Sequence, residues 1–198
     1  LRVEDNPLLS LGGEVLPVFI FDTHILSALD ADDRRVSFIF NRVMKLKNEL
    51  KTKGLDLKIY LGDPVEIFIF LEANGFDEVA ASGDYDKYTR ERDIRVSHIL
   101  HFHYLHDIYI FKPEEVLKDD GTPYLVFTPF YNKAKTHFSK VHMHEYSIAE
   151  QKLFKSSYEG ITKFDHGEEK QIPLEIESIG FKTNLPEIIE VEVKLEAL

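Results

Sequence analysis

Two acidic residues on one short loop are the first candidates for binding chemistry in this chain. Asp84 and Asp86 are separated by one residue and follow Gly83, which ends the apolar run 78–82. In an open parallel sheet, ligands bind where loops leave the carboxyl ends of the strands. Carboxylates at such a place can accept hydrogen bonds from the polar edge of a ligand. The alternative stays open that Asp84 only caps the following helix and that Asp86 only faces water.

Two neighbouring arginines are the second candidates. Arg34 and Arg35 stand at the start of a long amphipathic helix, which the apolar periodicity predicts over 33–53. Cations at a helix N-terminus oppose the helix dipole, so a nearby carboxylate or an anionic ligand would explain their presence. A plain surface pair explains them equally well, since exposed charges change stability by only roughly a few tenths of a kcal/mol.

The elements that must position these residues alternate between strands and helices. Strands are predicted for four apolar runs, at 15–21, 57–61, 78–82 and 108–111. Helices are predicted at 33–53, at 65–74, in the segment that ends at Leu100, and at 128–138. These short spacings are typical of right-handed βαβ units. We therefore expect an α/β fold, namely a doubly wound, Rossmann-like, mainly five-stranded parallel sheet with helices on both faces and an irregular C-terminal linker.

The domain organisation follows from where the periodicity ends. Residues 1–144 are expected to form one α/β domain, because the apolar patterning is regular up to His144. Residues 145–198 are expected to be a linker, since Ser, Lys, Glu and Gly dominate there and the apolar islands are brief. The chain opens with Leu1 rather than Met, so we expect its natural start, and with it a first strand, to lie upstream.

The composition excludes several classes of protein. The 198 residues include no cysteine, which rules out a disulfide framework and suits the reducing cytosol. No apolar stretch is long enough to span a membrane, so no membrane partner is expected. The net charge of −11 would repel a phosphate backbone. We therefore expect this segment not to grip nucleic acid directly.

Histidines are the remaining candidates, as possible metal ligands. They occur in two groups, His98, His101, His103 and His106, and then His137, His142 and His144. A metal site needs at least three convergent ligands with supporting second contacts, and no known zinc-binding pattern surrounds either group. Solvated or locally hydrogen-bonded histidines are the favoured interpretation, and no metal is expected.

A set of short motifs is spread over about residues 1–140. The motifs are Asp5-Asn6-Pro7-Leu8, the strand 15–22, Gly62-Asp63-Pro64, Tyr85-x-x-Tyr88-x-x-x-Arg92-Asp93 and Phe127-Thr128-Pro129-Phe130. Each motif is weak alone, but the set, in this order and spacing, resembles the family of DNA photolyases and cryptochromes.

This resemblance implies that the chain is one part of a two-domain enzyme. The family's N-terminal α/β domain holds a light-harvesting antenna chromophore. Its larger C-terminal helical domain binds FAD and UV-damaged DNA, and photoexcited reduced flavin splits pyrimidine dimers there. The parent would then be a carbon–carbon lyase, a deoxyribodipyrimidine photo-lyase, and residues 145–198 would lead to its FAD-binding domain. This piece would contain no catalytic residue and would be inactive alone, in keeping with its lack of Trp.

The resemblance also implies a type of antenna. In the folate-binding subgroup (MTHF) an Asn-Glu pair occupies the positions that Tyr88 and Thr89 hold here, so the carboxylate that would hold folate is missing. A deazaflavin similar to 8-HDF is favoured, since Arg35, Asp84 and Asp86 match that subgroup. Asp22 and Tyr88 are further, less specific candidates for contacts with the pigment. FAD or FMN as antenna, or an empty pocket, stay open.

Two other functions stay open as well. A cryptochrome-type blue-light photoreceptor would contain the same domain, and only its flavin domain and tail would distinguish it. A free-standing nucleotide-binding module of similar fold would instead bind ATP or AMP and would carry no pigment.

Overall fold

The computed structural model describes residues 1–155 and 157–185, and these form two compact units. Unit 1 consists of Leu1, residues 16–63 and, within the described part of the chain, residues 155 and 157–185. Unit 2 consists of residues 2–15 and 64–154. Both units contain parallel strands and helices, so the predicted α/β class is confirmed.

Unit 1 is built on a four-stranded sheet with the order β2-β3-β7-β8. The strands are β2 (Val18–Asp22), β3 (Lys58–Gly62), β7 (Ile161–Asp165) and β8 (Glu168–Ile172). β2, β3 and β7 run parallel to their neighbours, and β8 returns antiparallel to β7. The short helix α1 (Thr23–Leu26) follows β2, and the 3-10 helix η3 (Ile176–Ile179) follows β8.

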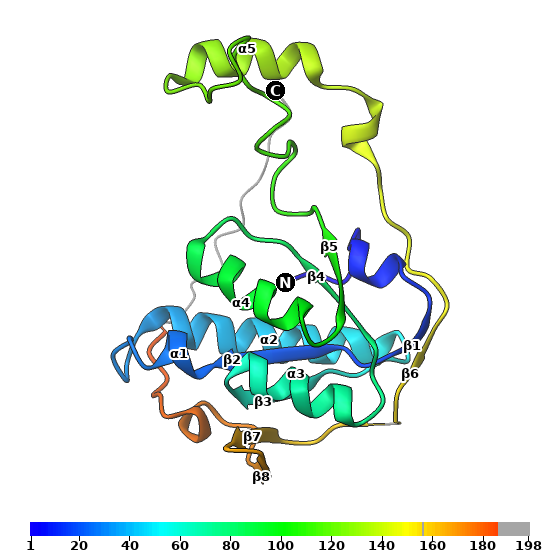
Figure 1. Cartoon of the computed structure of the whole chain (residues 1–198). Coiled ribbons are helices and arrows are strands. Elements are labelled where there is room, and N and C mark those ends of the chain that lie inside the picture. Colours follow the sequence, from blue (N-terminus) through cyan, green and yellow to red (C-terminus); the bar gives the residue numbers. More distant parts are fainter. Residues whose placement is uncertain (156, 186–198) are drawn as a thin grey trace, which may run out of the picture. The chain divides into compact units, whose positions relative to one another are not determined.

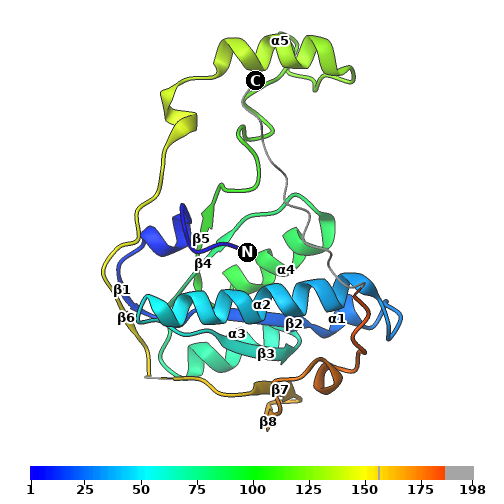
Figure 2. The same ribbon diagram turned by 180° about the vertical axis from the view of Figure 1, so that it is seen from behind.

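The long helix α2 (Arg34–Thr52) covers one face of this sheet, as the views from the two sides show (Figures 1 and 2). Its apolar stripe buries Val36, Phe40, Val43 and Leu50, and the ring of Phe40 stacks on that of Phe21 at 5.8 Å. Gly54, with φ of 77°, follows the helix in a left-handed conformation that glycine adopts without steric cost. The helix predicted at 33–53 therefore lies where the apolar pattern placed it.

Unit 2 contains the parallel pair β4 (Glu78–Ser82) and β5 (His101–Leu105) in register along their whole length. The helix α4 (Lys87–Ser97) connects these strands, and α3 (Pro64–Ala73) precedes them. A second parallel pair joins β1 (Gly13–Val15) to β6 (Gln151–Leu153). The remaining elements are η1 (Pro7–Ser10), α5 (Phe127–His137) and η2 (Lys140–Met143).

The strand predicted at 108–111 is wrong, because that segment contains no strand and β5 lies earlier in the chain. The helix predicted to reach Leu100 ends at Ser97, and the chain pairs with β4 from His101 onward. The histidines at 101 and 103 interrupt the apolar run by which a strand is recognised in the sequence. The strand forms all the same, because its backbone hydrogen bonds to β4 do not require apolar side chains.

The strands also pair differently from the five-stranded sheet expected from the sequence. The described residues form three separate hydrogen-bonded sheets of two, four and two strands. The segment expected to be an irregular linker contributes β6, β7, β8 and η3 up to residue 185, while its residues 156 and 186–198 lie outside the described part of the chain. Whether residues 145–198 lead to another domain stays a prediction.

Candidate functional site

The loop between β4 and α4 uses both of its acidic residues in local hydrogen bonds. Asp84 Oδ1 accepts a hydrogen bond of 2.6 Å from the amide of Tyr85, and the amide of Asp86 lies 3.4 Å from the same oxygen. Asp86 is the N-cap of α4, because its Oδ2 accepts from the amide of Thr89 at 3.2 Å. The capping role considered for Asp84 thus belongs to Asp86. Each carboxylate is exposed and keeps an oxygen that can accept a further hydrogen bond.

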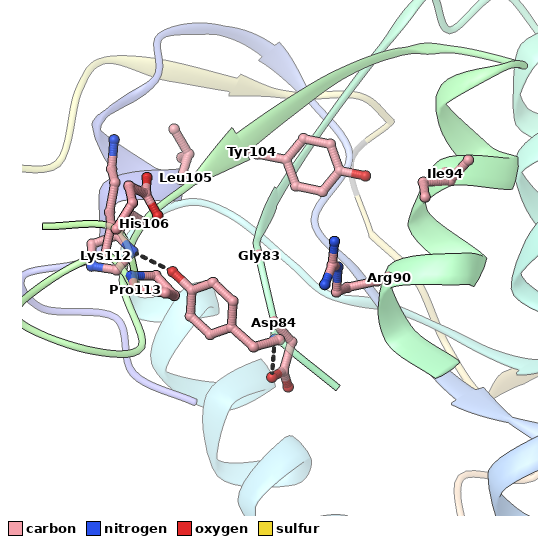
Figure 3. A pocket seen from close by; sticks show the side chains of 11 residues that line it. Gly83, Asp84, Arg90, Ile94, Tyr104, Leu105, His106, Lys112 and Pro113 are labelled. Atoms are coloured by element: carbon pink, nitrogen blue, oxygen red, sulfur yellow. Dashed lines mark hydrogen bonds between the residues drawn. The ribbon is translucent and has the colours of Figure 1, made fainter. Parts of the chain in front are cut away.

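A pocket of about 630 Å³ lies in unit 2 at the carboxyl ends of β4 and β5. In Figure 3, Arg90 and Ile94 project from α4 and Tyr104 projects from β5 toward the same space. Asp84 is the only predicted site residue that lines the pocket. The lining residues are Gly83, Asp84, Tyr85, Arg90, Ile94, Tyr104, Leu105, His106, Lys112, Pro113 and Glu114. A volume of this size is typical of sites for small molecules and cofactors.

Tyr85 and His106 form a hydrogen-bonded aromatic wall of this pocket. Tyr85 Oη lies 3.1 Å from His106 Nδ1, and the Tyr85 ring stacks on that of Tyr109 with centroids 5.7 Å apart. Desolvation by burial, followed by the negative charges of Glu114 and Glu115, raises the pKa of Tyr85. The hydroxyl therefore stays protonated near neutral pH and can donate to His106. Within the described residues His106 Nε2 is buried without a partner, so a ligand or a water molecule would have to satisfy it.

The charges at the pocket are mixed, with two cations that are available to a ligand. In the part of the chain that the structure describes, neither the guanidinium of Arg90 nor the ammonium of Lys112 has a hydrogen-bond or ion-pair partner. Glu114 and Asp84 lie at the same pocket. Burial, together with the negative charge of Asp93, raises the pKa of Tyr104 above its ordinary value. Neutral aromatic rings beside cations suit a flat aromatic ligand that carries an acidic oxygen.

The other predicted site residues lie elsewhere. Tyr88 is half-buried in the first turn of α4 and does not line the pocket, while Asp22 and Arg35 belong to unit 1. Asp22 is buried, with 6% of its surface exposed, and its Oδ1 accepts from the amide of His24 at 2.9 Å as the N-cap of α1. The structure thus groups Asp84, Asp86 and Tyr88 within one unit.

Arg35 forms an ion pair on the first turn of α2. Its Nη2 lies 2.6 Å from Asp33 Oδ2, and its Nε donates to Asp33 Oδ1 at 3.0 Å. The side-chain hydrogen bonds raise the pKa of Arg35 and lower that of Asp33. Of the explanations considered for these arginines, Asp33 supplies the nearby carboxylate for Arg35. Because 75% of the Arg35 side chain is exposed, the guanidinium remains accessible to a ligand.

Sequence reasoning missed most of the residues that line the pocket. Tyr104 and Leu105 escaped notice, and His106 was considered only as a metal ligand, because β5 was expected seven residues later in the chain than it lies. The missed signal is the alternation of aromatic and histidine residues in 101–106, which suits a half-buried strand. The histidines His101 and His103 lie on that strand with ring centroids 4.5 Å apart, and His103 Nε2 lies 3.2 Å from Glu78 Oε2.

Metal chemistry and membrane insertion find no support in the described residues. Among residues 1–155 and 157–185 no three His, Asp or Glu side chains converge as metal ligands would. Across the same residues, every helix is too short or too polar to cross a bilayer.

Comparison with known sequences identifies the family. The sequence model of DNA photolyase matches residues 1–149. A deoxyribodipyrimidine photo-lyase of Alkalihalophilus pseudofirmus is 36% identical over 128 residues, which make up 61% of this chain and 26% of that protein. A second one, from Halobacterium salinarum, is 31% identical over 129 residues, 61% of this chain and 26% of that protein. The chain therefore spans about a quarter of the length of these two relatives.

Solved structures show the same fold. A bacterial class III photolyase from Agrobacterium tumefaciens has a TM-score of 0.64 at 24% identity, over 80% of this chain and 35% of that one. An archaeal photolyase from Sulfolobus tokodaii, solved with two FAD molecules, has a TM-score of 0.54 at 23% identity, over 90% of this chain and 39% of that one. The resemblance seen in the motifs is thereby confirmed: the chain belongs to the DNA photolyase family, in which it corresponds to the N-terminal domain.

Proposed function

We propose that this chain is the light-harvesting domain of a deoxyribodipyrimidine photo-lyase and that it binds an antenna chromophore. The observation that carries the proposal is the pocket of about 630 Å³ at the ends of β4 and β5, in a chain of this family. The Sulfolobus relative supports it, since its two FAD molecules imply a light-harvesting cofactor in that protein. An antenna needs a rigid site that fixes the pigment, and no acid–base chemistry.

The residues that we propose to hold the pigment are Asp84 and Asp86 on the β4–α4 loop of unit 2 and Arg35 on the first turn of α2 in unit 1. Asp84 and Asp86 would accept hydrogen bonds from its polar groups, and Arg35 would pair with an acidic oxygen. Asp22 and Tyr88 would give further contacts. Deazaflavin is proposed over folate because Thr89 stands where the folate-binding subgroup has a carboxylate. FAD or FMN would use the same aromatic walls.

A titration of the purified chain tests this proposal. Deazaflavin, FMN, FAD, a reduced folate and AMP are added separately, and binding is followed by pigment fluorescence or, for AMP, by calorimetry. We expect deazaflavin to bind most tightly. Binding of AMP with none of the pigments would overturn the antenna role and favour a nucleotide-binding module. Tight binding of folate alone would overturn the assignment of Asp84 and Asp86.

The enzymatic reaction is proposed for the parent protein. There, reduced FAD in a C-terminal helical domain would split pyrimidine dimers in UV-damaged DNA by light-driven electron transfer, and this piece alone would be inactive. Two curated relatives that match this chain carry the name of that enzyme. The net charge of −11 suggests that DNA contacts belong to the other domain. We also propose that the protein works in the cytosol, since it has no cysteine to oxidise.

An exposed apolar segment supports the proposed partner domain. In unit 2, the chain that enters α5 exposes Leu125, Val126 and Phe127 by 89%, 64% and 73%, and Tyr131 on the helix by 50%. Contiguous apolar exposure of this kind usually marks an interaction surface. We propose that the FAD-binding domain of the same protein covers it, because the two photo-lyases are about four times as long as their matched region.

A further inference from the structure

The chain that follows the family match is fastened to unit 1 at both of its ends. We call residues 157–184 the strap. The match to the family model ends at residue 149, before the strap begins. Between its two ends the strap forms β7 and β8, and β7 extends the sheet by pairing in parallel with β3. The strap is therefore part of the folded unit rather than a loose connection.

The first anchor is a buried ion pair that holds Tyr158. Asp56 Oδ2 accepts from the amide of Tyr158 at 2.8 Å, and Lys47 Nζ donates to the carbonyl of Tyr158 at 2.6 Å. Lys47 also donates to Asp56 Oδ1 and to the carbonyl of Leu57 at 2.6 and 2.7 Å. Lys47 and Asp56 expose only 4% and 2% of their surface. A buried charge needs this full set of partners, so the strap completes the site of Lys47.

Just before β7, the backbone at Gly160 lies close to the backbone at Ile172. Gly160 has φ of 70°, and a Cβ at this position would lie 2.7 Å from the carbonyl oxygen of Ile172. A side chain here would force the two strands of the hairpin apart. The path of the strap between its anchors is thus determined by backbone contacts.

The second anchor lies at the first turn of α2. The amide of Lys182 donates to the carbonyl of Ala31 at 2.7 Å, and Asn184 Nδ2 donates to that of Asp32 at 2.7 Å. The amide of Asn184 donates to Ser37 Oγ at 2.8 Å, and this hydroxyl donates to the carbonyl of Lys182 at 3.2 Å. Ser37 is 1% exposed, which makes its hydroxyl a fixed point between the helix and the strap.

These contacts lie next to Asp33, the residue that pairs with Arg35. The carbonyls that the strap binds belong to the two residues before Asp33. Asp33 caps α2 by accepting from the amide of Arg35 at 2.8 Å, and it holds the guanidinium of Arg35. Among the described residues the guanidinium has no other hydrogen-bond or ion-pair partner, and 75% of the side chain is exposed. Asp33 therefore holds the guanidinium, and the strap binds the residues on both sides of Asp33, namely Ala31 and Asp32 before it and Ser37 after it.

We infer that the strap is a positioning device for Arg35 and that Asn184 and Ser37 are its positioning residues. This inference rests on the proposed function, because it assigns the strap a role in pigment binding through Arg35. It goes beyond the family match, since both Asn184 and the hairpin lie outside it. A strap that fixes the first turn of α2 leaves the pigment less conformational freedom to remove on binding.

The experiment uses three variants of the whole chain. Asn184→Asp replaces the donor Nδ2 by an oxygen of the same size that repels the carbonyl of Asp32. Asn184→Ala removes the donor alone. Thr183→Ala, at an exposed neighbouring position with no described contact, is the matched control. Each is examined by hydrogen exchange at residues 31–36 and by titration with deazaflavin.

We expect faster exchange at residues 31–36 in both Asn184 variants and a roughly three- to tenfold loss of deazaflavin affinity, larger for Asn184→Asp. The control should change neither. In a double-mutant cycle, Asn184→Ala should have little further effect once Arg35 is replaced by Ala, because both act through one contact. A purely structural role would instead add its full effect in the Arg35→Ala background.

The outcomes distinguish the ordering of the first turn of α2 by the strap from the role of the strap in pigment binding. Unchanged exchange in both Asn184 variants would overturn the strap as a positioning device. Faster exchange with unchanged affinity, or additive effects in the cycle, would overturn its role in pigment binding. If the unaltered chain binds no pigment at all, the proposed function fails and this inference fails with it, while the exchange data still show whether the strap orders the first turn of α2.

Discussion

The ammonium group of Lys47 lies 2.6 Å from Asp56 Oδ1, and both side chains are almost completely buried in unit 1. Lys47 belongs to the apolar stripe of α2, between Val43 and Leu50, where a charge is unfavourable without partners. Its partners come from the α2–β3 loop and from Tyr158 on the strap. The pair thus joins the C-terminal segment to the helix that carries Arg35.

Replacing one partner of this pair should destabilise the fold strongly. Lys47→Met keeps the apolar stem but leaves the Asp56 carboxylate buried without its cation, which costs about 3 kcal/mol of unfolding free energy. Lys45→Met on the exposed side of the same helix, where Lys45 lies 3.8 Å from Glu49, should change it by less than about 0.5 kcal/mol. Urea denaturation followed by circular dichroism measures both. A loss of similar size in the two variants would contradict the role of the pair.

Stability should also fall in acid through Asp56. Burial alone would raise the pKa of Asp56, but hydrogen bonds from Lys47 and from the amides of Tyr158 and Leu57 outweigh it and hold the pKa below 3.8. A lowered folded pKa means that Asp56 stabilises the fold above its unfolded pKa and loses this effect as the pH falls through the folded value. The stability difference between the unaltered chain and Asp56→Asn should therefore shrink below about pH 4. A difference independent of pH from 6 to 2 would argue against this.

Substitutions of the loop carboxylates Asp84 and Asp86 should distinguish an effect on stability from an effect on pigment binding. Asp84→Ala with Asp86→Ala should weaken deazaflavin binding, since both acceptors disappear. The double variant should also lose about 1 kcal/mol of stability, because Asp86 caps α4. Asp86→Asn keeps a capping oxygen and should retain that stability. Titration and thermal unfolding are measured on the same samples, and unchanged pigment affinity in the double variant would remove both residues from the site.

Arg35 should matter for binding and hardly at all for folding. Its side chain is 75% exposed, so Arg35→Ala should change the unfolding free energy by less than about 0.5 kcal/mol. Loss of a charge-assisted hydrogen bond to the pigment should lower affinity roughly tenfold or more. Arg34→Ala, at the neighbouring exposed position, is the control and should leave affinity unchanged. Equal losses in the two variants would point to a general effect of charge.

The local elements and the family followed from the sequence alone, because both depend on residues close together in the chain. The stripe of Val36, Phe40, Val43 and Leu50 predicted α2, and the apolar run before Gly62 predicted β3. The ordered motifs from Asn6 to Phe130 indicated the photolyase family without any tertiary information. Side-chain periodicity is set by backbone geometry, so these predictions needed no knowledge of distant partners.

Only the tertiary structure decided which distant segments meet. Asp56 and Tyr158 are separated by 102 positions, and no pattern in the sequence pairs them. The strap escaped prediction because β7 has few apolar residues and is held by backbone bonds to β3. Likewise the alternation in 101–106 suits a strand, but only the pairing of β5 with β4 showed where it lies, and with it the pocket that Tyr104 and His106 line. Backbone hydrogen bonds between strands are indifferent to side chains, and for that reason the sequence does not encode them locally.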